Sequence, residues 1–294
     1  MANKRVTDLL RLHFKQHTRP DNSSYRAILF ADVCEIATET GLSIKAVECA
    51  ALEAGIVPER YSRNQTSLSN VEQLQLLRSH VAIIGLGGLG GTVTELLARI
   101  GVGCLTLVDG DCFDESNLNR QLLSCPANLG RPKTEAARVR TQEINPAVEV
   151  RTIPEFFKAE NGQAILHGAQ LAIDCLDTIT ARFLLEEACR RASIPLISAA
   201  IGGSSGQATV IFPEDPGLQN IYGASGKTRN RGIEASVGTL PYGAVYMAAV
   251  ECAEATAILL GRPSDLRNRL LIAETNDHTT EIFNLPGFVA DSAD

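Results

Sequence analysis

The sequence predicts an α/β protein with a doubly wound, mostly parallel sheet and late antiparallel strands, preceded by a small helical N-terminal domain. Three observations predict this class. Short apolar runs alternate with helical segments between about residues 80 and 200, which is typical of a parallel sheet covered by helices on both faces. Two more strand-like runs follow the last long helix. Residues 1–57 carry only helical signals, so we expect a separate, larger domain over 58–294.

Residues 1–57 are expected to form three helices separated by turn signals. The cluster 20–24 marks one turn, and Gly41 followed by Ser43 provides a helix C-cap and the next N-cap. Residues 1–60 hold eight basic and eight acidic side chains, so the basic face that phosphate binding requires is missing and no nucleic acid is expected. A bundle for packing or partner recognition is favoured. The predicted helices are Val6–Gln16, Tyr25–Thr40 and Ile44–Ala54.

Composition predicts where the protein is located and whether its cysteines bind zinc. The chain has 294 residues, 45% of them hydrophobic, and a net charge of −7. No apolar run approaches the about 20 residues that span a bilayer, and the N-terminus lacks a signal-peptide core, so we expect a cytoplasmic protein without membrane contact. The eight cysteines are scattered and no C-x-x-C pair occurs. Reduced thiols are therefore favoured, and no zinc is expected because a paired-cysteine site is excluded.

A glycine motif follows the first buried strand. Val81–Ile84 is a short apolar run, and Gly85, Gly87 and Gly90 then give G-x-G-x-x-G at the start of a helix. Glycines allow phosphate to approach backbone amides, and the helix N-terminus favours its negative charge. The next strand ends at Asp109, near the spacing of an acid that holds a ribose hydroxyl. The motif predicts a Rossmann-like nucleotide site.

After the glycine motif, strands and helices continue to alternate until a long polar segment interrupts them. A polar segment with several glycines and prolines, 213–237, is expected to be a functional crossover loop. Expected helices after the glycine motif are Thr134–Glu143, Ala164–Ala169, Thr180–Ala192 and Tyr242–Leu260. Expected strands are Val148–Ile153, Leu171–Asp174, Pro195–Ala200, Gln207–Phe212, Leu270–Glu274 and Thr280–Phe283.

Several short motifs identify a family. They are R-Y-S-R-N (60–64), G-L-G-G-L-G (85–90), D-G-D-x-x-x-x-S-N-L-N-R-Q (109–121), G-R-P-K (130–133), N-P (145–146) and D-C-L-D-x-x-x-x-R (174–182). With these motifs the chain resembles the ThiF/MoeB/HesA group, the bacterial relatives of ubiquitin-activating enzymes, over about Arg60 to Leu285. The S-N-L-N-R-Q block is the most specific of them, because ordinary dehydrogenases do not carry it.

The resemblance implies an ATP- and Mg²⁺-dependent adenylyltransferase. Its substrate would be the C-terminal carboxylate of a ubiquitin-like sulfur-carrier protein ending in Gly-Gly, and its products an acyl-AMP and pyrophosphate. The carboxylate is ionised at pH 7, so no general base is required. The chemical difficulty is electrostatic, since two anions must meet and charge grows on the departing pyrophosphate.

The resemblance also assigns roles to residues at the matching motif positions. The catalytic set is Arg120, Lys133, Asp177 and Arg63. Within it, Arg120 contacts the phosphates, Lys133 neutralises the leaving group and Asp177 binds Mg²⁺. Arg63 reaches the partner subunit's nucleotide, which implies a homodimer. The nucleotide-binding set is Gly85, Gly87, Gly88, Gly90, Asp109, Asn117 and Gln121.

The chain departs from the family pattern in three places. It lacks the paired cysteines that hold zinc in many relatives, its crossover loop contains no cysteine, and the usual Asp-Asn pair reads Asp177-Thr178. Cys252 lies in an apolar helix and is expected to be a buried structural thiol. A reaction that stops at the adenylate is therefore favoured.

Other interpretations remain open at this stage. The same chemistry could act on a peptide terminus or a tRNA-nucleoside carboxylate, with the N-terminal domain as a recognition module. From another class, an NAD-dependent oxidoreductase would use the glycine motif and Asp109 but would leave Arg120, Lys133 and Asp177 without a role. An inactive dimeric adaptor is a further alternative. Asp111, Asp174 and Arg182 are expected to be structural, with Arg182 paired to Asp174 or Asp177.

Overall fold

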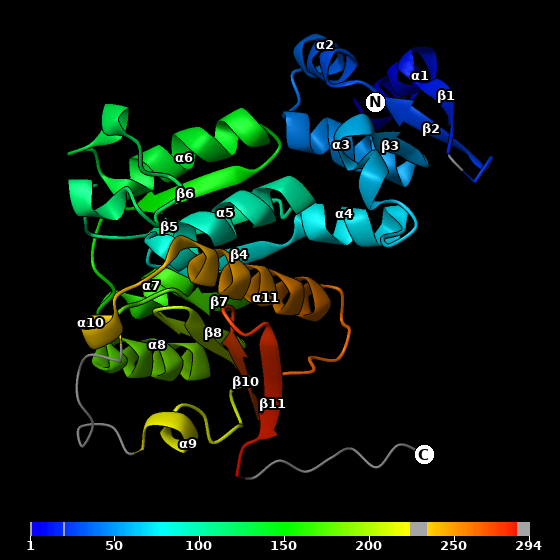
Figure 1. Cartoon of the computed structure of the whole chain (residues 1–294). Helices are drawn as coiled ribbons and strands as arrows, with labels where there is room; N and C mark the ends of the chain where they lie inside the picture. Colours follow the sequence, from blue (N-terminus) through cyan, green and yellow to red (C-terminus); the bar gives the residue numbers. More distant parts are fainter. Residues whose placement is uncertain (1, 20, 224–233, 287–294) are drawn as a thin grey trace, which may run out of the picture.

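The computed structural model describes residues 2–19, 21–223 and 234–286, and in these residues it contains two β-sheets (Figure 1). The larger sheet has the strand order β11-β10-β9-β8-β7-β4-β5-β6. Its parallel strands are β4 (His80–Ile84), β5 (Cys104–Val108), β6 (Glu149–Ile153), β7 (Leu171–Asp174) and β8 (Leu196–Gly202). Its antiparallel strands are β9 (Ser205–Ile211), β10 (Arg269–Glu274) and β11 (Thr279–Asn284). The predicted mostly parallel sheet with late antiparallel strands is confirmed.

Helices cover both faces of this sheet. Within β4, Val81 and Ile83 pack in one hydrophobic cluster, whereas Ala82 and Ile84 pack in another on the opposite face. Figure 1 shows α5 and α6 on one side of the sheet and α8 on the other, so the fold is doubly wound. The first cluster includes α4 (Asn70–Arg78), α5 (Gly88–Ile100), α6 (Lys133–Ile144) and α11 (Pro241–Leu259). The second includes α7 (Gly162–Leu166) and α8 (Ile179–Ala192).

The N-terminal unit contains strands as well as helices, which corrects the purely helical prediction. Its chain order is α1 (Ala2–His13), β1 (Lys15–Thr18), β2 (Ser24–Ile28), α2 (Phe30–Thr40), α3 (Ile44–Glu53) and β3 (Ile56–Pro58). The expected helix Tyr25–Thr40 is wrong over its first residues, because these pair with β1 and β3. Backbone pairing and burial of the end of β2 outweigh local helix propensity there. The turn between α2 and α3 is as predicted, with Gly41 left-handed at φ 71° and Ser43 as N-cap.

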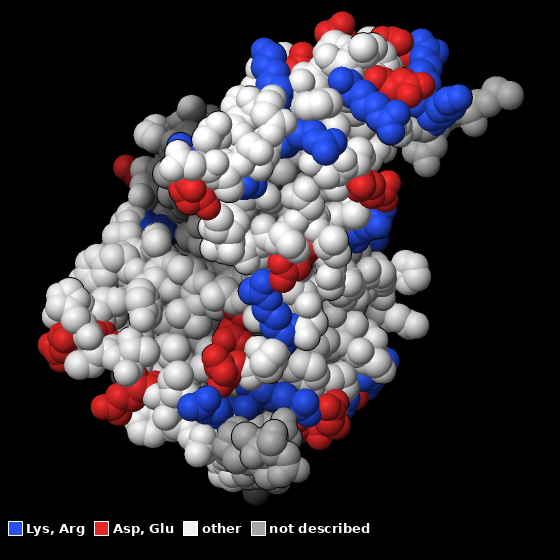
Figure 2. Space-filling model, turned by 90° about the vertical axis from the view of Figure 1, so that its right-hand side faces the viewer, with Lys and Arg blue, Asp and Glu red and all other residues white. Residues whose placement is uncertain are grey.

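Charge on the N-terminal unit is mixed. Figure 2 shows basic and acidic side chains interspersed over the unit at the top of the molecule, without a patch of one sign. Several of these charges are paired, including Arg5 with Glu39 at 2.9 Å. The unit therefore presents no basic stripe on this face for a nucleic acid.

A buried polar group joins the N-terminal unit to the larger sheet. Asn145, after α6, donates to the Tyr61 hydroxyl at 2.8 Å and to the Ala98 carbonyl at 2.9 Å. Its own side-chain oxygen accepts from Arg60 at 2.6 Å, and Arg60 forms an ion pair with Glu48 of α3 at 3.2 Å. Arg60 and Tyr61 belong to a 3₁₀ helix, Glu59–Asn64. The predicted boundary at residues 57 and 58 stays a prediction.

The crossover segment 213–237 is not entirely irregular. It contains α9 (Gln219–Tyr222) and α10 (Glu234–Val237), while 224–233 lie outside the described residues, as do 287–294. Over the described part of the chain, no helix is both long enough and apolar enough to cross a membrane.

The buried acid Glu48 should make stability depend on pH. Burial raises its pKa from 4.5 to about 7, against the opposing effect of Arg60. The folded state therefore keeps a proton that the unfolded chain releases. The contribution of Glu48 to the free energy of unfolding is full below about pH 4.5 and is lost as pH rises through 7. Relative to Glu48→Gln, the wild-type free energy of unfolding should fall by about 2–3 kcal/mol between pH 5 and pH 8 in urea titrations. The exposed Glu53→Gln in the same helix is the control, and an equal pH dependence in both variants would contradict the assignment.

Candidate active site

A large cavity opens at the carboxyl ends of the parallel strands. It has a volume of about 1130 Å³ and is lined from the ends of β4, β5, β7 and β8. From β4 the chain proceeds to β5 on one side of the sheet and later returns to β7 on the other side. Loops diverge at such a switch point and leave a crevice, which is where open α/β sheets bind ligands.

The predicted glycines divide into two kinds. Gly87 and Gly88 line the cavity, directly at the N-terminus of α5. Gly85 also lines it, but its backbone has φ 94° and a Cβ there would lie 2.6 Å from the Cys175 carbonyl oxygen. Gly90 is not among the lining residues, and its Cβ would lie 1.8 Å from the Gly85 carbonyl oxygen. Gly90 therefore permits close helix packing. No side chain caps α5, so its first amides are free to face an anion.

Asp109 holds the glycine turn in place. Its two carboxylate oxygens accept from the amides of Leu86 at 2.7 Å and Asp111 at 2.8 Å. Burial raises the pKa of Asp109 above its ordinary value, while Lys133 acts in the opposite direction. The carboxylate lines the cavity as predicted, and it supports the turn in addition to any contact with a ribose.

Lys133 supplies a buried cation to the same cavity. It is only 6% exposed, and its Nζ lies 3.2 Å from Asp111 and 3.9 Å from Asp109. Asp111 was expected to be structural, and the structure gives it this ion pair together with a place in the cavity wall. The ammonium group is thus held at the end of β5 by two carboxylates.

The S-N-L-N-R-Q block contributes two of its three predicted residues to the cavity. Arg120 lines it and donates to the Ser116 carbonyl at 3.0 Å and the Asn119 side chain at 2.9 Å. Gln121 is buried, lines the cavity, and has an Oε1 with no hydrogen-bond partner among the described residues. Such an orphaned buried acceptor fits a ligand that donates a hydrogen bond. Asn117 is not a lining residue and instead accepts from the amide of Asp114 at 3.2 Å.

Asp177 and Asp174 at the end of β7 have different environments. Asp177 is exposed and lines the cavity, where a carboxylate is available to a hard cation. Asp174 is fully buried, 3.0 Å from Arg182, and accepts from the Ser198 hydroxyl at 2.6 Å. Arg182 also donates to the Ala199 carbonyl at 2.6 Å. The expected structural pair is therefore Asp174 with Arg182, and Arg182 also contributes to the cavity lining.

Arg63 lies far from the cavity of its own chain. It is exposed, two residues after Tyr61, which packs against Gly101 beyond the C-terminus of α5. The cavity is at the other end of this 13-residue helix, about 20 Å away. Within one chain Arg63 does not join the site, so its role in a partner subunit's site stays a prediction.

Aromatic residues of the cavity were missed by sequence reasoning. Phe156 and Phe157 line it, and Phe156 packs against Gly110. Their position just after β6 could have predicted this, because the carboxyl ends of parallel strands share the edge of the sheet where ligands bind. Tyr222 also lines the cavity and accepts from Gln207 at 2.9 Å. No sequence motif announced it, since it comes from the crossover segment.

Glu251 of α11 was also missed. It is fully buried, and burial together with Asp174 raises its pKa well above the ordinary range. The Cys175 thiol donates to it at 4.0 Å.

Neither Cys252 nor Cys175 has the environment of a thioester-forming cysteine. All eight are free, and Cys252 is buried with its thiol 3.8 Å from the Val93 carbonyl, as expected for a structural residue. Cys175 lines the cavity, but burial and the nearby Glu251 raise its thiol pKa well above the usual value. A thiol held protonated in this way is a poor nucleophile.

Comparison with known proteins identifies the family of this chain. The ThiF family model matches residues 61–289. The chain belongs to the ThiF family. Its relatives include the SAMP-activating enzyme E1 of Haloferax volcanii, 32% identical over 76% of this chain and 83% of that protein. The molybdopterin-synthase adenylyltransferase of Haemophilus influenzae is 34% identical over 73% of this chain and 89% of that protein. The expected adenylyltransferase class is thereby confirmed for this ThiF-family chain.

Solved structures agree with the fold. The crystal structure of E. coli MccB superimposes with a TM-score of 0.66 at 22% identity, covering 77% of this chain and 69% of that one. The structure of PaaA gives a TM-score of 0.64 at 23% identity, covering 77% and 73%. At this identity the similarity concerns the fold, and it confirms the predicted α/β class.

The contact between Gly90 and Gly85 should be intolerant of a side chain. Gly90→Ala places a Cβ against a backbone oxygen, so the Tm should fall by at least about 4 °C in thermal denaturation followed by circular dichroism. Gly88→Ala is the matched control in the same helix, because its Cβ would lie 3.4 Å from the Ala244 side chain. Equal Tm values for the two variants would show that this packing is not close.

Proposed function

We propose that this ThiF-family protein adenylates, in the cytoplasm, the C-terminal carboxylate of a ubiquitin-like carrier protein ending in Gly-Gly, using ATP and releasing pyrophosphate. One observation carries the proposal. Lys133, Arg120 and the uncapped N-terminus of α5 converge on a single cavity at the switch point of the sheet. Three sources of positive potential suit a ligand with several phosphates.

The chemistry asks little of the protein beyond charge and position. A carboxylate nucleophile is already ionised, so its attack on the α-phosphorus needs no general base. The bond from this phosphorus to the bridging oxygen breaks, and pyrophosphate leaves with the negative charge. Lys133 is suited to stabilise that charge, because it is buried and already fixed by Asp109 and Asp111.

The residues present fit ATP and Mg²⁺. The orphaned Oε1 of Gln121 offers an acceptor to a ribose hydroxyl or an adenine amine, and Gly87 leaves space for a phosphate beside the backbone. Asp177 is the carboxylate for Mg²⁺, which when bound would neutralise phosphate charge. The structure of MccB with ATP has a TM-score of 0.63 to this chain, which supports a nucleotide in this fold.

The identity of the acid rests on the relatives. SAMP-activating E1 and molybdopterin-synthase adenylyltransferase align over most of their length and favour a protein carrier. A peptide is the second candidate, because solved structures similar in fold contain MccB with MccA. A tRNA-nucleoside carboxylate is a third acid that the same chemistry accommodates. An NAD-dependent oxidoreductase is disfavoured, since it leaves Lys133 and Arg120 without a role.

A homodimer would complete the site. Arg63 is exposed and lies near the end of α5 that is remote from its own cavity, a position that supports the role in a second copy of the chain that the family resemblance implies. Two-fold symmetry would then give each cavity the partner's arginine.

ATP–pyrophosphate exchange tests the reaction and the acid together. With Mg²⁺ present, exchange should appear only when a small protein ending in Gly-Gly from the same cell is added. A carrier lacking its last two residues is the matched control, because its C-terminal carboxylate is two residues too short to reach the position of reaction. Exchange with peptides alone would replace the carrier by a peptide, and NAD binding without ATP binding would overturn the proposal.

Mixing two inactive variants tests Lys133 and the partner's Arg63. Lys133→Ala should lower the exchange rate by about 10²–10³-fold because the leaving charge loses its cation, whereas Arg138→Ala, exposed on the same helix, should not. Arg63→Ala should also be inactive. A subunit-exchanged 1:1 mixture of the two variants should recover about a quarter of wild-type activity, since half of the dimers then hold one complete site. No recovery would contradict a role across the dimer.

A further inference from the structure

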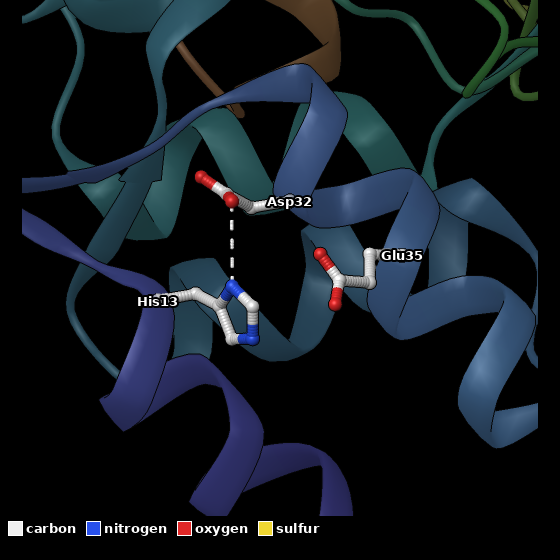
Figure 3. A group of neighbouring side chains, drawn as sticks. All are labelled: His13, Asp32 and Glu35. Carbon is white, nitrogen blue, oxygen red and sulfur yellow. Dashed lines mark hydrogen bonds and ion pairs between the residues drawn. The ribbon is translucent and has the colours of Figure 1, made fainter.

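Three potential metal ligands meet at the end of the N-terminal helix, remote from the cavity. His13 is the last residue of α1, and Asp32 and Glu35 lie one turn apart near the start of α2. Each offers a ligand atom, and these atoms lie within 4.8 Å of one another. In Figure 3 the carboxylates of Asp32 and Glu35 both point toward the imidazole ring. His13 and Asp32 are each 24% exposed, so the group is partly shielded and still reachable from solvent.

The distance between His13 and Asp32 fits two ligands that share one ion. His13 Nδ1 and Asp32 Oδ1 are 3.3 Å apart. The two atoms form a long hydrogen bond, near the upper end of the usual N–H···O range. Two ligand atoms at about 2.0–2.1 Å from a tetrahedral ion stand about 3.3–3.4 Å apart. The pair is therefore already spaced as two corners of a tetrahedral site.

Charge also favours a cation here. In the described part of the chain, neither Asp32 nor Glu35 lies within ion-pair distance of a lysine or arginine. Other acids of the unit do have such partners, such as Glu39 with Arg5 at 2.9 Å between the same two helices. Two carboxylates thus face one imidazole, which leaves net negative charge at the group.

We propose that His13, Asp32 and Glu35 bind a divalent transition-metal ion of the Zn²⁺ class, which ties α1 to α2. Imidazole with carboxylates suits such an ion better than Mg²⁺ or Ca²⁺, which prefer oxygen ligands alone. Glu35 is exposed, so a water completes the tetrahedron. The absence of C-x-x-C pairs excludes a cysteine zinc site and does not concern this one. The ion fixes the free end of the N-terminal unit and takes no part in the proposed reaction.

Zn²⁺ titration of the full chain tests the site. The EDTA-treated protein should bind one equivalent of Zn²⁺ by calorimetry. The affinity for this Zn²⁺ should fall by about 100-fold or more in His13→Ala and Glu35→Gln. Zn²⁺ should raise the Tm of the wild type and not that of these variants. Glu35→Gln keeps the shape of an exposed side chain, so its loss of binding cannot be ascribed to misfolding.

Matched controls separate this site from other metal binding. His167→Ala removes an exposed histidine outside the N-terminal unit, and this variant should still bind one equivalent of Zn²⁺. Mg²⁺ at the same concentration should neither bind there nor raise the Tm. The proposal is overturned if the wild type binds no Zn²⁺, if binding is unchanged in His13→Ala and Glu35→Gln, or if Mg²⁺ binds equally well. Adenylation is expected to be similar in all these variants, so failure here would leave the proposed function standing.

Discussion

The close approach of the turn after β4 to the end of β7 is the constraint on which the active-site region depends. A side chain at Gly85 would meet the Cys175 carbonyl at 2.6 Å, and one at Gly90 would meet Gly85 itself at 1.8 Å. Because glycine alone fits both places, α5 can begin directly above the sheet with its uncapped amides toward the cavity. The anion site is therefore made by the backbone, and the charged side chains are placed around it.

Charge around that turn is arranged in two layers. At the cavity wall, Lys133 is held between Asp109 and Asp111, so its position is set before any phosphate arrives. Deeper at the end of β7, the buried Asp174 is paired with Arg182, which also lines the cavity and donates to the Ala199 carbonyl. A fixed cation costs little reorganisation when charge develops nearby, which is how electrostatic catalysis gains its effect. The buried pair contributes by keeping the strand ends rigid.

Residues of the family motifs make the polar contacts that attach the N-terminal unit to the larger sheet, a role that the motifs alone did not indicate. Arg60, Tyr61 and Asn145 belong to the segments that identified the family, and in the structure they form the joint between α3, α5 and α6. Buried hydrogen bonds of this kind are directional, so they define one orientation of the unit against the sheet. The sequence showed Arg60 only as part of a family motif and not its partner, because a salt bridge to a buried acid 12 residues earlier leaves no periodic signal.

The sequence by itself determined the parallel sheet, the glycine turn, the late antiparallel strands and the charged residues Lys133, Arg120 and Asp177 of the cavity wall. These signals are local: apolar runs, a glycine spacing and motifs at strand ends. The tertiary structure alone decided what depends on contacts between distant segments. It turned the start of an expected helix into β2, kept Asn117 and Gly90 out of the cavity wall, and brought in Phe156 and Tyr222. It also placed His13 beside Asp32 and Glu35. Pairing and packing between residues far apart in the chain set these positions, and no local pattern encodes them.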